Sequence, residues 1–411
     1  MTKQNKGIPT PILLTLALCS GFSPFAIDTY IAGLPEITED LNTSASLTQA
    51  TLTGFLLSLG LMQLVVGPWS DQVGRRKLML TGLLGAAVAS ALCALAPNIW
   101  VLIIARVIQG GFGAAGVVLA RASVGDLGQG IGVAKAFAML MSIQSVAPLV
   151  APIIGGVMIP SLGWRSVFWF LTALAALMFV SVLFIVPETL PAEQRSAGGI
   201  RSSLSDVGVL LRSRTYTAPL TVFVATFAVL FAYIAASPFV LQRIGGLGQV
   251  EYSIVFTINA LALLLMNMLS RALVPKVGPV RLTQGGVALS AVAVVWLGVG
   301  ILVFNTAAWA MIPGFFALVA AAGIIMPNAS ALCIDASADR RGTGSALMGA
   351  VQFSFAAMIA PLTGIGDGTT AIPMLSIMLA GGATQVISLR AQQMVARFKS
   401  LERTPQSARP H

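Results

Sequence analysis

Residues 101–122, VLIIARVIQGGFGAAGVVLARA, decide the fold. The run is long and apolar enough for a membrane-spanning helix, yet Arg106 stands inside it. A charge there costs at least a few kcal/mol, so such a residue usually faces a cavity or a partner. Gly110 and Gly113 follow on the same helical face, where small residues let a neighbouring helix or a ligand approach. Arg106 is therefore predicted either to brace two helices, or to bind substrate or sense protonation of a nearby acid.

The composition extends this interpretation to the whole chain. Of the 411 residues, 56% are hydrophobic and only 9% are charged, whereas a soluble domain carries about 25% charged residues. Apolar runs of about 18 residues or more recur along the chain, and a crossing takes about 20, so the length allows about twelve spans. We therefore predict an all-α polytopic membrane protein. The net charge of +10 is interpreted as a topology signal, with no nucleic acid as partner.

The predicted spans follow one another with short connections. They cover residues 10–33, 46–68, 77–96, 99–122, 132–160, 164–186, 217–241, 250–274, 281–304, 307–334, 342–366 and 370–394. The first is interpreted as an uncleaved helix rather than a signal peptide, because its apolar run continues to Gly33. The predicted domains are an N-terminal six-helix bundle, a cytoplasmic linker, a C-terminal six-helix bundle and a cytoplasmic tail, at 1–186, 187–216, 217–394 and 395–411 respectively.

The basic residues set the predicted orientation. With the N-terminus in the cytoplasm, all of the 24 Lys and Arg except Arg106, Arg165 and Arg243 fall at the inner face, as the positive-inside rule requires. This predicts a multi-pass protein of the inner membrane with both termini cytoplasmic. Within the linker, Leu204 to Leu211 is predicted to be either a short amphipathic surface helix or part of a solvated connection.

The two halves of the chain echo each other. Residues 151–155 (APIIG) correspond to 360–364 (APLTG), 209 positions later, and 74–77 (GRRK) correspond to 278–281 (GPVR), 204 positions later. The similar offsets indicate a duplication and predict two pseudo-symmetric bundles. Internal repeats of this kind place the binding site near the midplane, between the halves.

A motif stands between the second and third predicted spans, at residues 67–77, GPWSDQVGRRK. It resembles the signature loop of the major facilitator superfamily, G-x-x-x-D-x-x-G-R-R-x. The resemblance implies the major facilitator fold and a conformational lock of the outward-open state, in which Asp71 contacts a basic group such as Arg121 or Arg341. The motif residues are Gly67, Asp71, Gly74, Arg75 and Arg76.

Two further segments resemble motifs of the same superfamily. Residues 106–110, RVIQG, are similar to its R-x-x-Q-G motif. The fifth predicted span holds Pro152, Gly155 and Gly156, which are similar to the P-x-x-G-G core of the motif described for antiporters, although Ala151 replaces a glycine. The proline removes a backbone hydrogen bond and the glycines permit bending, so an ordinary kinked helix is the alternative interpretation.

The end of the first span, SPFAIDTYIAGLP at residues 23–35, resembles the D-x-Y-L-P-A-x-P segment of the Bcr/CflA drug:proton antiporters, but departs at residues 31–32. That branch includes bicyclomycin and phenicol exporters. Asp28 is the acid that we place within a span, at a depth similar to that of Arg106. Burial disfavours its charged form and a nearby cation favours it, which makes Asp28 a candidate proton carrier. Alternatively, Asp28 ends the helix at the interface.

Other polar side chains in the spans are candidates for binding substrate, although each has the alternative role of tying helices together. The predicted substrate-binding residues are Tyr30, Arg106, Gln109, Gln144, Tyr233, Asn259 and Gln352.

The leading functional hypothesis is proton-coupled export of small amphipathic drugs or metabolites by a monomer in the lipid bilayer, energised by the proton gradient without a cofactor. The alternative is a proton symporter that imports a small nutrient, for example an anion held by Arg106. An enzyme is disfavoured because the sequence lacks a nucleotide loop, a metal cluster and a nucleophile triad. The three cysteines fall in apolar runs, which does not favour a disulfide framework.

Overall fold

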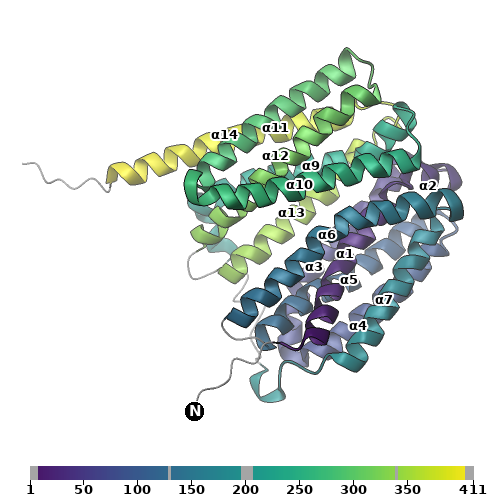
Figure 1. Ribbon diagram of the computed structural model, residues 1–411, viewed down its shortest axis with the longest axis vertical. Coiled ribbons are helices and arrows are strands. Elements are labelled where there is room, and N and C mark those ends of the chain that lie inside the picture. Colours follow the sequence, from purple (N-terminus) through teal and green to yellow (C-terminus); the bar gives the residue numbers. More distant parts are fainter. Residues whose placement is uncertain (1–7, 128–130, 196–206, 338–340, 403–411) are drawn as a thin grey trace, which may run out of the picture.

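Long helices joined by short connections make up the computed structural model, which describes residues 8–127, 131–195, 207–337 and 341–402 (Figure 1). The long helices of the first half are α1 (Thr10–Ile31), α3 (Ala45–Val73), α4 (Arg75–Ala94), α5 (Ile99–Leu127), α6 (Ile131–Leu162) and α7 (Arg165–Ile185). Those of the second half are α9 (Arg214–Pro238), α10 (Gln249–Val277), α11 (Pro279–Leu302), α12 (Ala308–Ala336), α13 (Arg341–Thr363) and α14 (Ile372–Glu402). The short elements are α2 (Leu34–Asp40), η1 (Ala192–Gln194) and the π-helix η2 (Phe239–Ile244).

Each predicted span coincides with one long helix, so the all-α prediction is confirmed. Within the described residues, 11 helices are long and apolar enough to cross a membrane, and α6 adds a helix of 32 residues. The predicted ends need correction. The tail predicted from 395 begins inside α14, and the predicted linker ends inside α9. A helical turn covers 207–212, but Leu204 lies outside the described residues.

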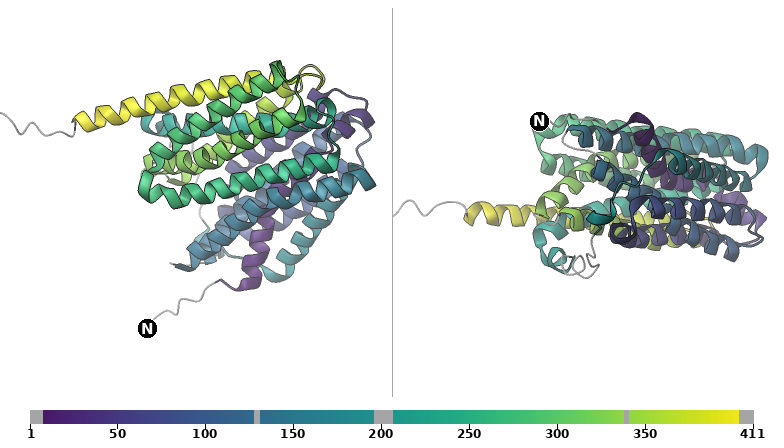
Figure 2. Two further views of the ribbon diagram at one scale, coloured as in Figure 1. Left: turned by 45° about the horizontal axis from the view of Figure 1, so that its top comes forward. Right: turned by 90° about the horizontal axis from the view of Figure 1, so that it is seen from below.

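The long helices pack as two bundles, one from each half of the chain (Figures 1 and 2). Between the bundles, α3 packs against α13 and α6 packs against α10. The bundles meet near α2 and diverge toward the opposite end, where α3 turns into α4 at Gly74 (Figure 1). We call these two ends of the molecule the α2 end and the Gly74 end.

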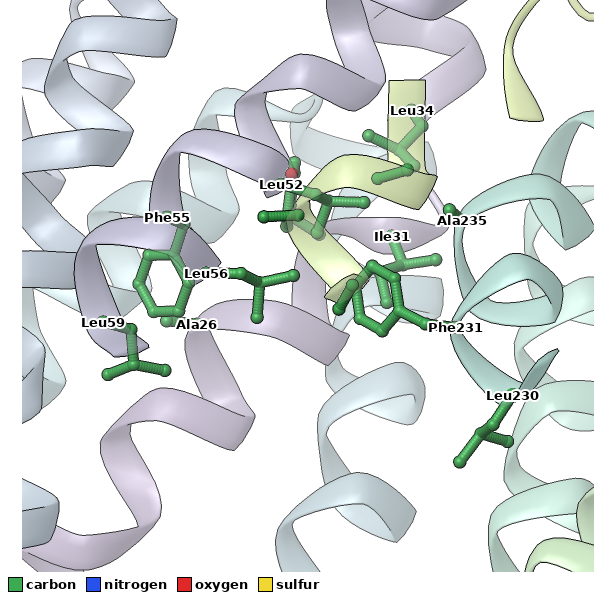
Figure 3. Packing of buried hydrophobic residues seen from close by; sticks show 14 of the residues in the cluster. Ala26, Ile31, Leu34, Leu52, Phe55, Leu56, Leu59, Leu230, Phe231 and Ala235 are labelled. Atoms are coloured by element: carbon green, nitrogen blue, oxygen red, sulfur yellow. The ribbon is translucent and has the colours of Figure 1, made fainter. Parts of the chain in front are cut away.

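Apolar side chains join the bundles near the α2 end. Figure 3 shows Phe231 of α9 pointing toward Ile31 of α1, with Leu56 of α3 beside them. All three side chains are buried. In a membrane such contacts act through close packing rather than through the exclusion of water, so complementary shape must hold this end together.

Glycines allow several helices to approach closely. A Cβ at Gly110 of α5 would collide with the carbonyl oxygen of Phe55 on α3, and one at Gly155 of α6 would collide with that of Thr29 on α1. Gly156 serves the other side of α6, where a Cβ would collide with Ser253 of α10. The antiporter-like segment of α6 therefore packs against both bundles at once.

The motif at residues 67–77 is not the loop that the sequence analysis places there. Residues up to Val73 belong to α3 and Arg75 begins α4, so Gly74 alone separates the two helices. Its φ of +106° is a conformation that favours glycine. Gly278 repeats this geometry between α10 and α11 with a φ of +84°. The junctions that correspond by sequence offset thus have the same construction.

Replacement of Gly110 by alanine is expected to destabilise the protein by about 1–3 kcal/mol, because the added methyl group forces α3 and α5 apart. The neighbouring Gly111→Ala change is the matched control. Its Cβ would lie 3.6 Å from Cγ of Met62, an ordinary contact, and alanine favours the helix. Thermal unfolding of the detergent-solubilised variants measures the difference. Equal melting temperatures for the two variants would contradict the packing described here.

Candidate functional site

A cavity of about 560 Å³ lies between the two bundles. On α3, α5, α6 and α13 its lining residues lie in the middle or in the Gly74-side half of the helix. The bundles diverge at that end (Figure 1), so the cavity is reached from the Gly74 end. On α1 the lining continues past the middle to Ile27, toward the α2 end. The lining comes from α1, α3, α5 and α6 of the first bundle and α13 of the second. The residues are Ser20, Ser23, Pro24, Ile27, Leu59, Gln63, Leu64, Val117, Val118, Arg121, Gln144, Ser345, Met348, Gly349, Gln352 and Phe353.

The cavity face of α1 follows helical spacing. Ser20, Ser23, Pro24 and Ile27 line the cavity at positions i, i+3, i+4 and i+7. Asp28 continues this stripe one turn beyond Pro24, toward the α2 end, and its side chain is 8% exposed. The helical spacing of these residues is visible in the sequence and could have predicted that the two serines share a face. It places Asp28 just beyond the lining residues, on the side of the α2 end.

Two tyrosines of the second bundle, Tyr233 and Tyr252, lie within electrostatic reach of Asp28. The Asn259 amide donates to the Tyr233 hydroxyl at 2.9 Å, and Tyr252 and Ser237 share a hydrogen bond of 3.0 Å. Tyr233 and Asn259 are therefore buried within the second bundle, and neither is among the residues that line the cavity.

Arg106 is fully buried within the first bundle. Its Nη1 donates to the carbonyl oxygen of Ala26 at 3.0 Å and to Oε1 of Gln109 at 2.6 Å. The guanidinium carbon lies 4.4 Å from the ring centre of Tyr30 and 4.3 Å from that of Phe55, close enough for cation–π attraction. This arrangement ties α1, α3 and α5 together around one cation.

Arg106 lies at the depth predicted for it, because it contacts Ala26, two residues before Asp28 on α1. In the described part of the chain, the side chains of Arg106 and Asp28 do not form an ion pair. Tyr30 bonds to Thr51 at 2.8 Å, and Gln109 donates to Ser90 at 2.7 Å. In this conformation, the candidate residues Tyr30, Arg106 and Gln109 form a buried network, while Gln144 and Gln352 reach the cavity.

Arg121 is the cationic side chain among the described residues of the cavity wall. Its Nη2 donates to Oε1 of Gln144 at 3.0 Å, and Nε2 of Gln144 lies 3.5 Å from the carbonyl oxygen of Ser20 as its donor. Pro24 has no N–H to offer that carbonyl, so the helix leaves it free. The sequence analysis assigned Arg121 only to the conformational motif and missed its place in the cavity.

The conformational motif forms its ion pairs inside the first bundle. Asp71 pairs with Arg75 at 2.7 Å, and Arg75 also contacts Asp126 at 3.1 Å. The predicted contact of Asp71 with Arg121 is absent here, because Arg121 turns to Gln144. The side chain of Arg341 lies outside the described residues.

Three other motif residues lie within the first bundle, and one of them holds a neighbouring helix. Arg76 donates through Nη2 to the carbonyl oxygen of Leu183 on α7 at 2.7 Å. A Cβ at Gly67 would lie 3.8 Å from Val118 of α5, an ordinary contact. Pro152 is buried within α6. Gly67, Gly74 and Arg76 thus lie at the Gly74 end of the first bundle, whereas Pro152 lies in the half of α6 nearer the α2 end.

Hydrogen bonds between the bundles close the α2 end. Nε2 of Gln49 donates to the carbonyl oxygen of Ala235 at 3.0 Å, and Gln49 accepts from Thr363 at 3.1 Å. Thr53 donates at 2.6 Å to the carbonyl oxygen of Ala357, a group that Pro361 leaves without its helical partner. Three further bonds cross the boundary, namely Ser46 to Pro361 O, Gln242 to Ala32 O and Gln249 to Glu36 Oε2.

Ionic contacts outside the spans hold α2 in place. Arg165 donates to Asp40 at 2.6 Å and the Trp164 indole donates to it at 3.0 Å. These hydrogen bonds hold the pKa of the Asp40 carboxyl below its usual value, and the bond from Arg165 has the largest effect. Arg243 donates to the carbonyl oxygen of Asp367 nearby. Arg165 and Arg243, which the sequence analysis assigned to the outer face, thus both lie at the α2 end.

Comparison with known proteins gives consistent matches over most of the chain. Residues 16–361 match the family model described as Major Facilitator Superfamily. An uncharacterized MFS-type transporter, YdgK of Bacillus subtilis, is 34% identical over 88% of this chain and 90% of its own length. A bicyclomycin resistance protein homolog of Haemophilus influenzae is 29% identical over 92% of this chain and 94% of its own. MdtL of Salmonella heidelberg, a multidrug resistance protein, is 29% identical over 58% of this chain and 60% of its own.

Solved structures agree with the fold. A mutant of the nucleoside transporter NupG superposes with a TM-score of 0.74 at 11% identity, covering 93% of this chain and 99% of its own. A bacterial homolog of the human lysosomal transporter Spinster, in an inward-facing and unoccupied conformation, superposes with a TM-score of 0.73 at 16% identity. The match covers 99% of this chain and 100% of the homolog. At such identities the likeness concerns the fold alone.

Loss of the Gln49 contacts is expected to open the α2 end. The Gln49→Leu change removes two hydrogen bonds between the bundles, each with a net value of about 0.5–1.5 kcal/mol. The opening can be measured with a single cysteine introduced at Ala32, which is 1% exposed, after the native cysteines have been replaced. The reaction of this cysteine with a polar thiol reagent should accelerate at least about fivefold.

The matched control for this experiment is Gln63→Leu, the same change on the same helix. Gln63 lines the cavity and has no hydrogen bond across the boundary among those described. An equal acceleration in both variants, or none in Gln49→Leu, would contradict the assignment of Gln49 to the closure.

Proposed function

The chain belongs to the Major Facilitator Superfamily, and from this premise we propose that it exports small amphipathic compounds by proton-coupled alternating access. It is a multi-pass membrane transporter and not an enzyme. The resistance proteins among its relatives support export. Together with the resemblance of residues 23–35, they support placement in the Bcr/CflA branch, with phenicol-like or bicyclomycin-like substrates.

The position of Asp28 is the observation that carries the proposal. Asp28 and Arg106 are the charged residues that are buried in the described part of the chain, and buried charge within a membrane usually marks a functional site. Asp28 lies between the cavity and the closed α2 end, where a proton from one side can be passed to the other when the bundles move. Arg106 lacks that access and is proposed to position α1 through the Ala26 carbonyl.

Protonation of Asp28 is proposed to favour the conformation described here. A neutral carboxyl group is much less costly to bury than a carboxylate. When the α2 end is open, Asp28 takes up a proton from outside, and the closure then buries it in neutral form. Entry of water into the cavity from the Gly74 end promotes release of the proton inside. The charged carboxylate next favours the return to the conformation that is open at the α2 end.

The proposed orientation follows from the charge distribution. The Gly74 end, with its arginines, the start of α1 and the end of α14, faces the cytoplasm, and the α2 end faces outward across the inner membrane. A single chain contains the cavity and the Asp28 site, so a monomer suffices for transport. Import by proton symport would use the same cavity, so an experiment must distinguish import from export.

Replacement of Asp28 by asparagine is expected to abolish proton-driven transport, because the amide cannot bind and release a proton. The test is drug susceptibility of an efflux-deficient bacterium that expresses the protein, with phenicols and bicyclomycin. Everted membrane vesicles with an imposed pH gradient measure the flux directly. The expected result is protection by the unchanged protein and none by Asp28→Asn at equal membrane content.

The matched control is Asp40→Asn, which removes a carboxylate of α2 outside the membrane-spanning helices. This variant should retain proton-driven export. Normal export by Asp28→Asn would refute the coupling mechanism. Accumulation of substrate by intact cells with an inward proton gradient would instead establish the import alternative.

A further inference from the structure

We infer that the cavity recognises a small amphipathic molecule with one carboxylate or comparable oxyanion, held by Arg121 together with Gln144. The inference rests on the proposed function and extends it from neutral phenicol-like and bicyclomycin-like compounds to amphipathic anions. It concerns binding at equilibrium, so it does not depend on the direction of transport.

The charge of the cavity wall is the first observation. Among the described lining residues, Arg121 carries a charge and the remaining residues are neutral. The polar ones are amides and hydroxyls, namely Ser20, Ser23, Gln63, Gln144, Ser345 and Gln352. A cation in a low-dielectric cavity attracts an anion more strongly than it would in water, and it repels a second cation.

The hydrogen bonding of Arg121 is the second observation. Arg75 has two carboxylate partners and Arg165 has one, whereas the described residues supply Arg121 with the neutral Oε1 of Gln144. The side chain of Arg121 is exposed to the cavity. A guanidinium group has five donors in a planar fork, which suits the two oxygens of a carboxylate. The arginine is thus left with donors for a ligand.

An unpartnered hydroxyl points to a ligand independently. Oγ of Ser23 is buried and has no hydrogen-bond partner, although Ser23 lines the cavity near Ser20 and Gln144. A buried hydroxyl without a partner costs about 1–3 kcal/mol. The hydroxyl lies toward Gly113 of α5, where a Cβ would come within 3.8 Å of it, so a ligand oxygen that enters between α1 and α5 would satisfy it.

The apolar side of the cavity fits the body of such a molecule. Leu59, Leu64, Met348 and Phe353 complete the wall from α3 and α13. The volume of about 560 Å³ is in the range of pockets that hold drug-sized ligands. The arrangement therefore favours an aromatic or aliphatic body with an anionic group at one end.

Three probes with the same nitrophenyl body and different charge test the inference, namely 4-nitrobenzoate, 4-nitrobenzamide and (4-nitrobenzyl)trimethylammonium. Equilibrium dialysis with the purified full chain in detergent gives the affinity of each. The anion should bind most tightly and the cation most weakly. Arg121→Gln should weaken the anion about tenfold, the value of one charge-assisted hydrogen bond, and leave the neutral amide unchanged. Arg121→Lys should be intermediate, because it keeps the charge without the planar fork.

Arg281→Gln is the matched control, because this arginine is exposed at the start of α11, away from the cavity. It should preserve the order of the three affinities. Absence of anion binding, tightest binding of the cation, or equal weakening of all three probes by Arg121→Gln would overturn the inference. Flux in proteoliposomes separates this result from the proposed function. Anion preference without proton-driven export would refute only the proposed function. Export of neutral compounds without anion preference would refute only the inference about the cavity.

Discussion

The absence of hydrogen-bonding partners in the lipid is the constraint on which the structure depends. Each polar group in a span must find its partner within the protein. Two prolines each release a backbone carbonyl from the hydrogen-bond pattern of its helix, and the fold uses both carbonyls as acceptors. Pro24 leaves the carbonyl of Ser20 free for Gln144 in the cavity, and Pro361 leaves the carbonyl of Ala357 free for Thr53 at the closure. The backbone itself thus contributes acceptors where the two functions of binding and closing are located.

The same constraint explains why one conformation can give way to another. The bundles meet through α3 with α13 and α6 with α10, and a small set of side-chain to backbone bonds adds to the packing at the α2 end. Each such bond contributes only about 0.5–1.5 kcal/mol. Two arrangements of the bundles can then differ by a few kcal/mol, which a bound proton or substrate is able to reverse. Arg106, by contrast, is held inside one bundle and moves with it.

The sequence predicts the helices better than it predicts the site. Apolar runs locate the spans because a membrane crossing demands length and composition, whereas α2 has seven residues with three acids and no such run. Depth in the membrane follows from position along a helix, so Asp28 and Arg106 could be placed at similar levels. Their failure to pair, and the turn of Arg121 toward Gln144, depend on how helices are rotated against one another, and that follows from packing. The spacing of Ser20, Ser23 and Ile27 was the readable signal for the cavity.

Distances between the bundles test alternating access most directly. One pair of spin labels at Gln72 and Lys276 reports on the Gly74 end, and another at Glu39 and Thr369 reports on the α2 end, all on positions at the surface. Pulsed electron paramagnetic resonance in lipid, at low and high pH, measures both. Raising the pH should shorten the first distance and lengthen the second, since deprotonated Asp28 favours opening of the α2 end. Unchanged distances, or two distances that change in the same direction, would contradict the account.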